Sequence, residues 1–393
     1  MALLDDLNQL GTQGSDRRDV APAEAWRPRL ELDAAGGFLV STPRPATAQP
    51  DAAELLAEFD LDPAAWSVVS LRRSRWQRHD GEWLEAYRVN LAPADQQANR
   101  ADLDAEQLVD EIRKWRPRKG TTQASGDAAF LVNVGDQQIG KDAGSGSEGI
   151  VARVLAGHEA ALWRFRELRK LGRNIGTIGL PQLGDCIEGS VSTGGKVMGR
   201  SDLGVTAQVR VGRRLLMNQI KTFAPLVERV VVPVVPGNHD EPHRMLITDP
   251  VDSWQVEIAA AVQDACAENP ALAHVEFRYP ERDQQTLAVN FHGTVVGFAH
   301  GHQSRDAVKW WHGQATGRTP VGSADVLITA HYHHYKVAQV GPRLWVQIPA
   351  MDGGSAWFRD KTGLDSPTGI VTMLVGEGYD PRSDLAVIAG EQR

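Results

Sequence analysis

The chain has 393 residues, of which 42% are hydrophobic and 23% charged, and its formal net charge is −8 at pH 7. This length suffices for one large domain plus a smaller one, and the composition is that of a globular protein. The acidic balance excludes polyanion binding over the whole surface, so a nucleic-acid partner needs a local basic region. No apolar stretch is long enough to span a bilayer, and the two cysteines, Cys186 and Cys266, fit neither a zinc motif nor a disulfide framework. We therefore expect a cytoplasmic protein without a membrane partner.

The first third of the chain predicts two regions. Residues 1–50 are rich in Ala, Pro, Asp and Gly and predict a loosely ordered arm. Residues 51–125 predict a small α+β accessory module, in which the Asp80-Gly81 step suits a β-hairpin. The expected elements of this module are a helix over 52–59, strands over 66–76 and 83–91, and an amphipathic helix over 102–115.

From residue 126 to residue 393 the pattern changes to strands that alternate with helices, followed by a series of strands. This order predicts an α/β catalytic domain in which mixed sheets are covered by helices. The expected strands cover 129–134, 175–183, 230–235, 287–290, 294–299, 326–329 and 344–348, and the expected helices cover 148–171, 205–223 and 252–267.

Residues with metal-binding side chains follow five of these strands. Because loops at the carboxyl ends of strands converge on one edge of an α/β sheet, we expect these side chains to lie close together. Carboxylate and amide oxygens mixed with imidazoles favour Mn, Fe or Zn over Ca or Mg. In chain order the residues are Asp136-x-Gln138, Gly184-Asp185, Gly237-Asn238-His239-Asp240, His300 and His331-Tyr332-His333.

This order resembles the calcineurin-like metallophosphoesterase superfamily, whose pattern is Asp-x-His, Gly-Asp, Gly-Asn-His-Asp/Glu, a lone His and Gly-His-x-His. The resemblance covers residues 129 to about 350. It implies a four-layer sandwich of two packed mixed β-sheets flanked by helices, and two divalent metal ions, with Mn expected and Fe or Zn as alternatives. It also implies that Asp136 and His333 bind the first ion, that Asp185 bridges both, and that Asn238, His300 and His331 complete the second site.

The resemblance implies that two residues of the Gly-Asn-His-Asp motif serve catalysis. His239 would stabilise the transition state or protonate the leaving oxygen, and Asp240 is grouped with it as a catalytic residue. One position departs clearly from the superfamily pattern, because Gln138 stands where the pattern has His. The first metal site therefore gains an amide oxygen, directly or through water, or loses a ligand. A smaller departure is Ala330, which replaces the Gly of the last motif.

The neighbours of the motifs favour the nuclease and phosphodiesterase branches over phosphoprotein phosphatases, and the chain is similar in general style to large phosphoesterases of actinobacterial phages. Trp310-Trp311 and Trp357-Phe358 could stack on bases, although core packing explains them equally. Basic side chains could neutralise phosphates, although solvated helix faces explain them equally. These basic residues are Arg153, Arg164, Arg166, Arg169, Lys170, Arg173, Arg210, Arg213, Arg214 and Lys221. Near the expected hairpin, the side chains of Arg72, Arg73, Arg75 and Arg78 could also hold a nucleic acid, although packing on the catalytic domain or a dimer contact explains them equally.

The sequence thus predicts a dinuclear metal-dependent phosphodiesterase, with DNA as the expected substrate and nuclease activity as the expected function. The first alternative is hydrolysis of a small nucleotide or cyclic-nucleotide diester by the same residues. The second alternative is a non-catalytic scaffold with a degenerate metal site, for which Gln138 is the only support.

Overall fold

The computed structural model describes residues 28–33, 36–46, 50–78, 80–93, 103–118, 123–190, 201–242, 249–354, 360, 363 and 367–389. Residues 1–27 of the predicted arm, and Trp357 and Phe358, lie outside this part of the chain. The chain divides into two compact units, unit 1 (Met1–Glu106) and unit 2 (Gln107–Arg393). No helix among the described residues is long and apolar enough to cross a membrane.

Unit 1 contains an antiparallel sheet that begins inside the predicted arm. The arm prediction is wrong for residues 29–33, 36–40 and 44–45, because these residues form strands and Leu39 is fully buried in the same core as Leu55 and Val89. The predicted hairpin is confirmed, with Gln77 paired to Trp83 beside the turn. The strand order is β1-β2-β5-β3, and β4 pairs with β5. The elements are β1 (Arg29–Asp33), β2 (Gly36–Val40), β3 (Arg44–Pro45), α3 (Ala52–Ala57), β4 (Trp66–Gln77) and β5 (Trp83–Pro93).

The boundary predicted at residue 125 lies too late in the chain, because helix α5 (Leu103–Lys114) contributes to the core of unit 2. Its Leu108 and Ile112 are 3% and 0% exposed within that core. The side-chain amide of Asn269 donates to the backbone carbonyl of Ile112 at 2.5 Å and to that of Trp115 at 3.0 Å, which fixes the end of the helix. The chain therefore divides near residue 106, before the apolar face of α5.

The first sheet of unit 2 has six strands in the order β16-β15-β6-β7-β8-β9. The four strands from β6 to β9 are parallel, whereas β15 is antiparallel to β6 and β16 is antiparallel to β15. The strands are β6 (Ala128–Asn133), β7 (Ile175–Gly179), β8 (Arg229–Pro233), β9 (Val275–Arg278), β15 (Gly369–Val375) and β16 (Ala386–Ala389).

The second sheet of unit 2 has five strands in the order β10-β11-β12-β14-β13. The pairs β11–β12 and β12–β14 are parallel, and the two outer pairs are antiparallel. The strands are β10 (Thr286–Phe291), β11 (Thr294–Ala299), β12 (Val326–Thr329), β13 (Lys336–Val340) and β14 (Arg343–Gln347).

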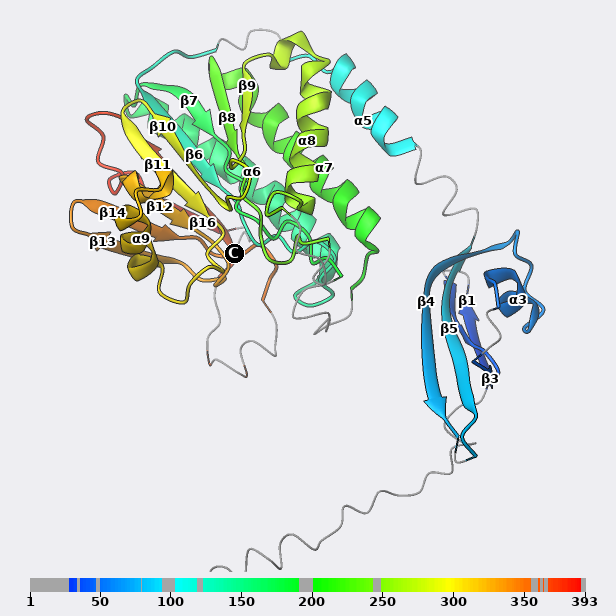
Figure 1. Ribbon diagram of the computed structural model, residues 1–393. Helices are drawn as coiled ribbons and strands as arrows, with labels where there is room; N and C mark the ends of the chain where they lie inside the picture. The colour runs from blue at the N-terminus through cyan, green and yellow to red at the C-terminus, as the bar shows by residue number, and fades with distance from the viewer. Residues whose placement is uncertain are drawn as a thin grey trace, which may run out of the picture. The chain divides into compact units, whose positions relative to one another are not determined.

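The two sheets pack face to face and carry helices on their outer faces (Figure 1). Leu131 and Val231 of the first sheet share a core with Phe298 and Val346 of the second. This confirms the predicted α/β class of two packed mixed sheets flanked by helices. The first sheet is covered by α5, α6 (Gly146–Lys170), α7 (Val205–Phe223) and α8 (Trp254–Ala267), the second by α9 (Ala307–Thr316), and short 3₁₀ turns occupy Ala224–Leu226, Pro270–Leu272 and Pro320–Ser323.

The sheet topology explains why distant motifs meet. Strands β6, β7 and β8 are adjacent and parallel, so the loops after them leave the same edge of the first sheet. Strands β11 and β12 form the corresponding parallel pair of the second sheet. Isolated bridges from Gln182 to Val134 and to Val234 continue the pairing past the strand ends. The loops that carry all five motifs therefore converge.

Candidate metal centre

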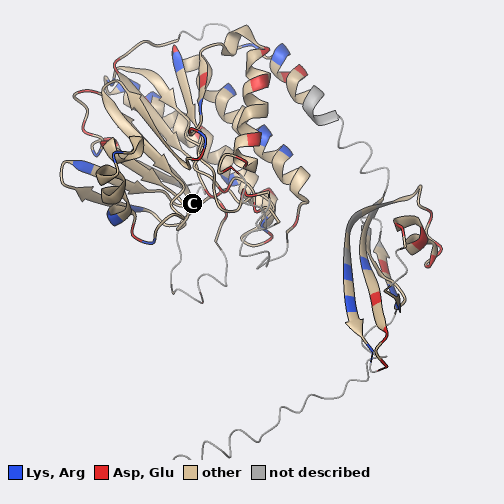
Figure 2. Ribbon diagram, viewed as in Figure 1, with Lys and Arg blue, Asp and Glu red and all other residues tan. Residues whose placement is uncertain are grey.

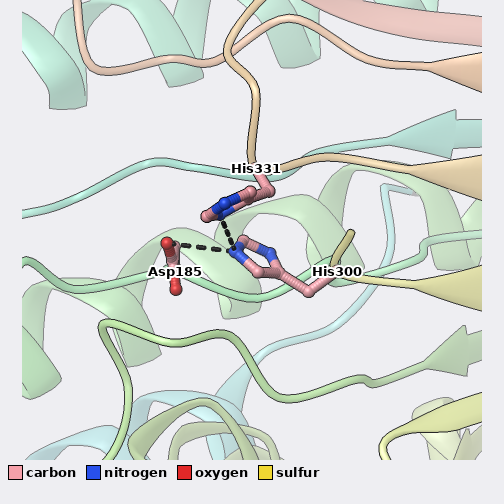
Figure 3. A group of neighbouring side chains, drawn as sticks. All are labelled: Asp185, His300 and His331. Atoms are coloured by element: carbon pink, nitrogen blue, oxygen red, sulfur yellow. Dashed lines mark hydrogen bonds and ion pairs between the residues drawn. The ribbon is translucent and has the colours of Figure 1, made fainter. Parts of the chain in front are cut away.

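Asp185, His300 and His331 form a compact cluster, and one ligand atom from each lies within 4.8 Å of the others (Figure 3). The Nε2 atom of His300 is 3.1 Å from Oδ2 of Asp185 and 3.2 Å from Nδ1 of His331. Oδ1 of Asn238 lies 3.2 Å from the same nitrogen. Two oxygens and one nitrogen, each from a separate loop, thus lie within 3.2 Å of Nε2 of His300. We call this place the second metal position in keeping with the motif order.

The tautomer of His300 is set by its other ring nitrogen. Nδ1 lies 2.7 Å from the backbone oxygen of Leu183, which can only accept a hydrogen bond, so Nδ1 carries the proton. In the neutral ring this leaves the lone pair on Nε2, the nitrogen that lies nearest to Asp185, Asn238 and His331. A histidine that donates through one nitrogen to a backbone carbonyl is the usual arrangement of a metal ligand.

The donor set fits a divalent ion. Ligand atoms about 2.1 Å from a shared ion lie about 3.0 to 3.4 Å apart in octahedral and tetrahedral arrangements, and the distances of 3.1 and 3.2 Å lie in that range. Two buried carboxylate oxygens face histidine nitrogens, Oδ2 of Asp185 at 3.1 Å from His300 and Oδ1 of Asp136 at 3.4 Å from His333. A buried carboxylate is costly unless a cation, either an imidazolium or a metal ion, compensates it.

Asp136 and His333 define a first metal position next to the second. Nε2 of His333 is 3.4 Å from Oδ1 of Asp136, and Oδ1 also lies 4.0 Å from Nε2 of His300. The other oxygen of Asp136 accepts a hydrogen bond of 2.8 Å from the backbone N–H of His331, which joins the two positions. Asp352, which the sequence analysis missed, lies 3.3 Å from Nδ1 of His333 and orients that ring.

Gln138 lies between the first position and a lysine. Its Oε1 accepts a hydrogen bond of 2.9 Å from Nζ of Lys141, and its Nε2 is 3.5 Å from Nε2 of both His239 and His333. The predicted ligand therefore reaches the predicted site, but the amide group that faces the two histidines is its NH₂.

His239 lies beside both positions with its side chain 19% exposed. Its Nδ1 is 3.2 Å from the backbone oxygen and 3.4 Å from the carboxylate of Glu188, and its Nε2 is 4.0 Å from Oδ2 of Asp185. Burial by itself lowers the pKa of His239, but the carboxylates of Asp185 and Glu188 raise it to about 9. In the metal-free chain this imidazole is therefore protonated at neutral pH, the form in which a histidine can act as a general acid. The sequence analysis missed Glu188, although its place three residues after Asp185 is a usable signal.

Asp240 holds the metal-binding loops together, and its predicted catalytic role stays a prediction. It is fully buried, and its carboxylate accepts backbone N–H groups of Asp185 at 2.6 Å, Gly237 at 3.1 Å and Ile187 at 3.4 Å. Burial and the nearby Asp185 charge raise the pKa of Asp240 to about 7. A carboxylate engaged by three backbone amides positions the metal-binding loops.

The backbone of the site is strained at the residues that bear the chemistry. Five of the ten non-glycine residues with positive φ in the described part of the chain are predicted site residues. Such conformations cost about 1 to 3 kcal/mol each and persist where the surrounding structure enforces them, often at functional sites. The five are Asp136, Gln138, Asp185, His331 and His333.

Two motif glycines are required by close approach. A Cβ atom at Gly237 would lie 2.1 Å from Oδ1 of Asp185, and one at Gly184 would lie 2.7 Å from the backbone of Gly237 and 2.8 Å from Nδ1 of His300. Any side chain at either position would displace the Asp185 and His300 donors. The Gly-Asp and Gly-Asn-His-Asp motifs are thus packing requirements as well as chemical ones.

The charges of the site favour a cation. Burial lowers the pKa of His300 and of His333, but nearby carboxylates, Asp185 for His300 and Asp352 for His333, raise these values to about 9 and about 10. Burial raises the pKa of Asp185, but the facing histidines lower it well below its usual range. Burial, together with the charge of His300, lowers the pKa of His331 to about 4. The imidazolium groups of His239, His300 and His333 thus neutralise the carboxylates of the site in the metal-free chain. Divalent metal ions can take over this role.

Five of the ten basic residues in and near α6 and α7 that suggested a DNA surface make known contacts within unit 2. Figure 2 shows acidic and basic stretches interspersed on its helical side. Arg153 is 5% exposed and donates to the backbone oxygen of Met351. Arg164 and Arg173 both pair with Asp384. The remaining assigned pairs are Arg213 with Glu257 and Arg214 with Glu111.

The base-stacking interpretation is wrong for Trp311. This side chain is fully buried in the core under α9, and its Nε1 donates to the backbone oxygen of Val321 at 2.8 Å. Trp310 packs partly buried against the same core. The tandem tryptophans therefore anchor α9 to the second sheet.

No model of a known protein family matches the chain, and no curated protein matches it. Among solved structures, the zinc-bound vacuolar protein sorting 29 protein of Entamoeba histolytica shows 15% identity over 67% of this chain and 99% of its own, with a TM-score of 0.29. A novel archaeal phosphodiesterase shows 14% identity over 66% and 99%, with a TM-score of 0.31. A predicted phosphoesterase of Streptococcus pneumoniae shows 10% identity over 67% and 88%, with a TM-score of 0.28. Similarities at this level establish no family, so the function has to follow from the residues of the site.

Proposed function

We propose that unit 2 is a metal-dependent phosphodiesterase of the calcineurin-like metallophosphoesterase superfamily. The observation that carries this proposal is the meeting of Asp185, Asn238, His300 and His331 around one point, beside a histidine with a raised pKa. Asp136 and His333 would hold the ion of the first metal position, with Asp185 between the two positions. Gln138 would join these ligands only by turning its oxygen away from Lys141. Divalent ions, which we propose to be Mn with Fe or Zn as alternatives, would stabilise phosphate charge and activate water when bound.

The chain itself supplies the proton for the leaving group. Glu188 engages Nδ1 of His239, so that Nε2 is the nitrogen that faces the metal positions. An imidazolium in this place can donate its Nε2 proton to the departing oxygen. A site that only bound metal would have no need for this acid, which favours an enzyme over a non-catalytic scaffold.

We propose DNA as the substrate, on the strength of an exposed basic and aromatic surface on unit 1. The guanidinium of Arg75 lies 4.7 Å from the ring centroid of Trp83, and Trp83 is 46% exposed. An arginine beside an exposed aromatic ring can contact a phosphate while the ring stacks on a base.

A small nucleotide or cyclic diester is the second candidate. The burial of Trp311 and the acidic partners of the α6 and α7 arginines favour it, because these features remove part of the polymer-binding surface expected of unit 2. The two candidates share the site and differ in whether unit 1 contributes to binding.

The deciding experiment measures hydrolysis of bis-p-nitrophenyl phosphate, p-nitrophenyl phosphate and labelled single- and double-stranded DNA, each with Mn and with chelator. We expect Mn-dependent cleavage of the diester and of DNA. The double variant Arg75→Gln/Trp83→Ser should weaken DNA cleavage and leave hydrolysis of the small diester unchanged.

Cleavage of the small diester alone would replace DNA by a small phosphodiester. Inactivity toward every substrate with Mn, Fe and Zn would contradict the enzymatic proposal.

A further inference from the structure

A lysine ammonium contacts both neighbours of His333 in the first metal position. Nζ of Lys141 is 2.9 Å from Oε1 of Gln138 and forms an ion pair with the carboxylate of Asp352, which is only 2% exposed. Asp352 lies 3.3 Å from Nδ1 of His333, and Nε2 of Gln138 lies 3.5 Å from Nε2 of the same ring. The side chains of Asp352 and Gln138 thus each lie between Lys141 and one ring nitrogen of His333.

This contact determines which end of the Gln138 amide faces the metal position. An ammonium group can only donate hydrogen bonds, so the atom 2.9 Å from Nζ of Lys141 must be the amide oxygen. The NH₂ group then points at His239 and His333. An amide NH₂ has no lone pair for a metal ion, so Gln138 in this orientation presents a hydrogen-bond donor where a ligand was expected.

The backbone around Lys141 is held in place rather than free to move. The N–H of Lys141 donates to the backbone oxygen of Gln138 at 3.0 Å, and Lys141 forms a β-bridge with Ser201. Gly140, with φ of +105°, lies against Gln208 so closely that a Cβ atom would lie 2.3 Å from the Gln208 side chain. Because this turn is packed, Lys141 enters the site as a preorganised group.

We propose that Lys141 is a resident cation that gives the two metal positions unequal affinities. The ion at Asp185, Asn238, His300 and His331 binds tightly, whereas the ion at Asp136 and His333 binds weakly. Two effects weaken metal binding at the first position. The ammonium group of Lys141 repels a metal ion there, and it holds the oxygen of Gln138 away from that ion. This inference rests on the proposed function, because it concerns the metal ions of the same centre.

The test is a titration of the metal-free full-length chain with Mn²⁺, followed by calorimetry and by electron paramagnetic resonance, which detects spin-coupled Mn pairs. We expect one tight and one weak binding event in the unchanged protein. Lys141→Met should strengthen the weak event by about 10- to 100-fold, the range by which groups around metal ligands alter affinity, and leave the tight event unchanged. Coupled pairs should then form at correspondingly lower Mn²⁺ concentration.

Two further variants separate charge from other effects. Lys141→Arg keeps the positive charge and should keep the weak event weak. Lys170→Met removes an exposed lysine from the end of α6 and should behave as the unchanged protein. Retention of the tight event in each variant shows that the centre has folded.

Two results would overturn the proposal for Lys141. The first is an unchanged weak binding event in Lys141→Met. The second is loss of that binding event, which would mean that the lysine supports the ion of the first metal position. Failure of the unchanged protein to bind any ion tightly is a different outcome, because it contradicts the proposed metal-dependent function itself.

Discussion

The first and second metal positions lie side by side in unit 2, but they are built differently. The second position collects His300 and three residues whose ligand atoms lie 3.1 to 3.2 Å from its Nε2, namely Asp185, Asn238 and His331. The first position brings Asp136 and His333 together and adds Gln138, whose oxygen is taken by Lys141. Two metal positions can therefore both have their motifs in the expected order and still differ in charge, because other residues, here Lys141, contact the motif side chains.

The largest effect that we expect is a loss of turnover that leaves metal binding at both positions unchanged. His239→Ala removes the imidazolium that we propose as the general acid, and kcat should fall by about 10²- to 10⁴-fold. Metal content, measured by elemental analysis, should stay unchanged because His239 is not a ligand in either position. A parallel loss of bound metal would show that His239 is structural.

The next effect compares equivalent histidines of the two positions. His331→Ala removes one of four donors from the second position, and the affinity for the tight ion should fall by more than about 100-fold, beyond what loss of an outer-shell group costs. His333→Ala should leave that ion in place and abolish the weaker one. Calorimetric titration with Mn²⁺ measures both, and equal effects of the two changes would remove the distinction between the positions.

A smaller gain should follow when the first position receives the imidazole found in the superfamily pattern. Gln138→His supplies a nitrogen ligand and ends the bond to Lys141, so the weak ion should bind about tenfold more tightly. The exposed Gln339→His serves as the matched control, since it adds a histidine on β13. An unchanged weak binding event in Gln138→His would show that the identity of residue 138 does not limit this position.

The smallest effect concerns the stability of the metal-free chain. The folded pKa values of His300 and His333, about 9 and about 10, exceed the ordinary value of 6.5. Their contribution is therefore fully present below about pH 6.5 and is lost as the pH rises toward 9 and 10. The Tm of the metal-free chain should fall by several degrees between pH 6.5 and 9.

Excess Mn²⁺ should remove this decline, because metal binding requires neutral imidazoles in the folded state. Differential scanning fluorimetry at each pH tests both statements, and a metal-free Tm that rises over this range would contradict the charge assignment.

Much of unit 2 could be predicted because its signals are local. The strands Thr294–Ala299 and Val326–Thr329 and the helix Val205–Phe223 have the predicted bounds, since their apolar residues follow the period of one element. By contrast, β15 (Gly369–Val375) was missed, although its residues are buried throughout. It pairs with β6, more than 230 residues earlier in the chain, and local periodicity carries no information about such a partner.

Unit 1 shows the same kind of error, missed strands, for a different reason. Its first strands were missed because β1, β2 and β3 are short and lie in a segment rich in Ala, Pro and Gly, where composition predicts an arm. Leu39 is buried because it packs in one core with Leu55 and Val89. That core exists only in the assembled sheet. Likewise α5 looks amphipathic in either unit, and only packing shows that Ile112 belongs to unit 2.

The sequence by itself determined which side chains gather at the site, because each motif directly follows a strand and parallel strands bring their ends to one edge. The tertiary structure decided what these side chains can do. It engages His239 with Glu188, buries Asp240 among backbone amides, and joins Lys141 to Asp352 across 211 residues. Protonation, ligand orientation and local charge depend on contacts between distant residues, so no motif read along the chain could have contained them.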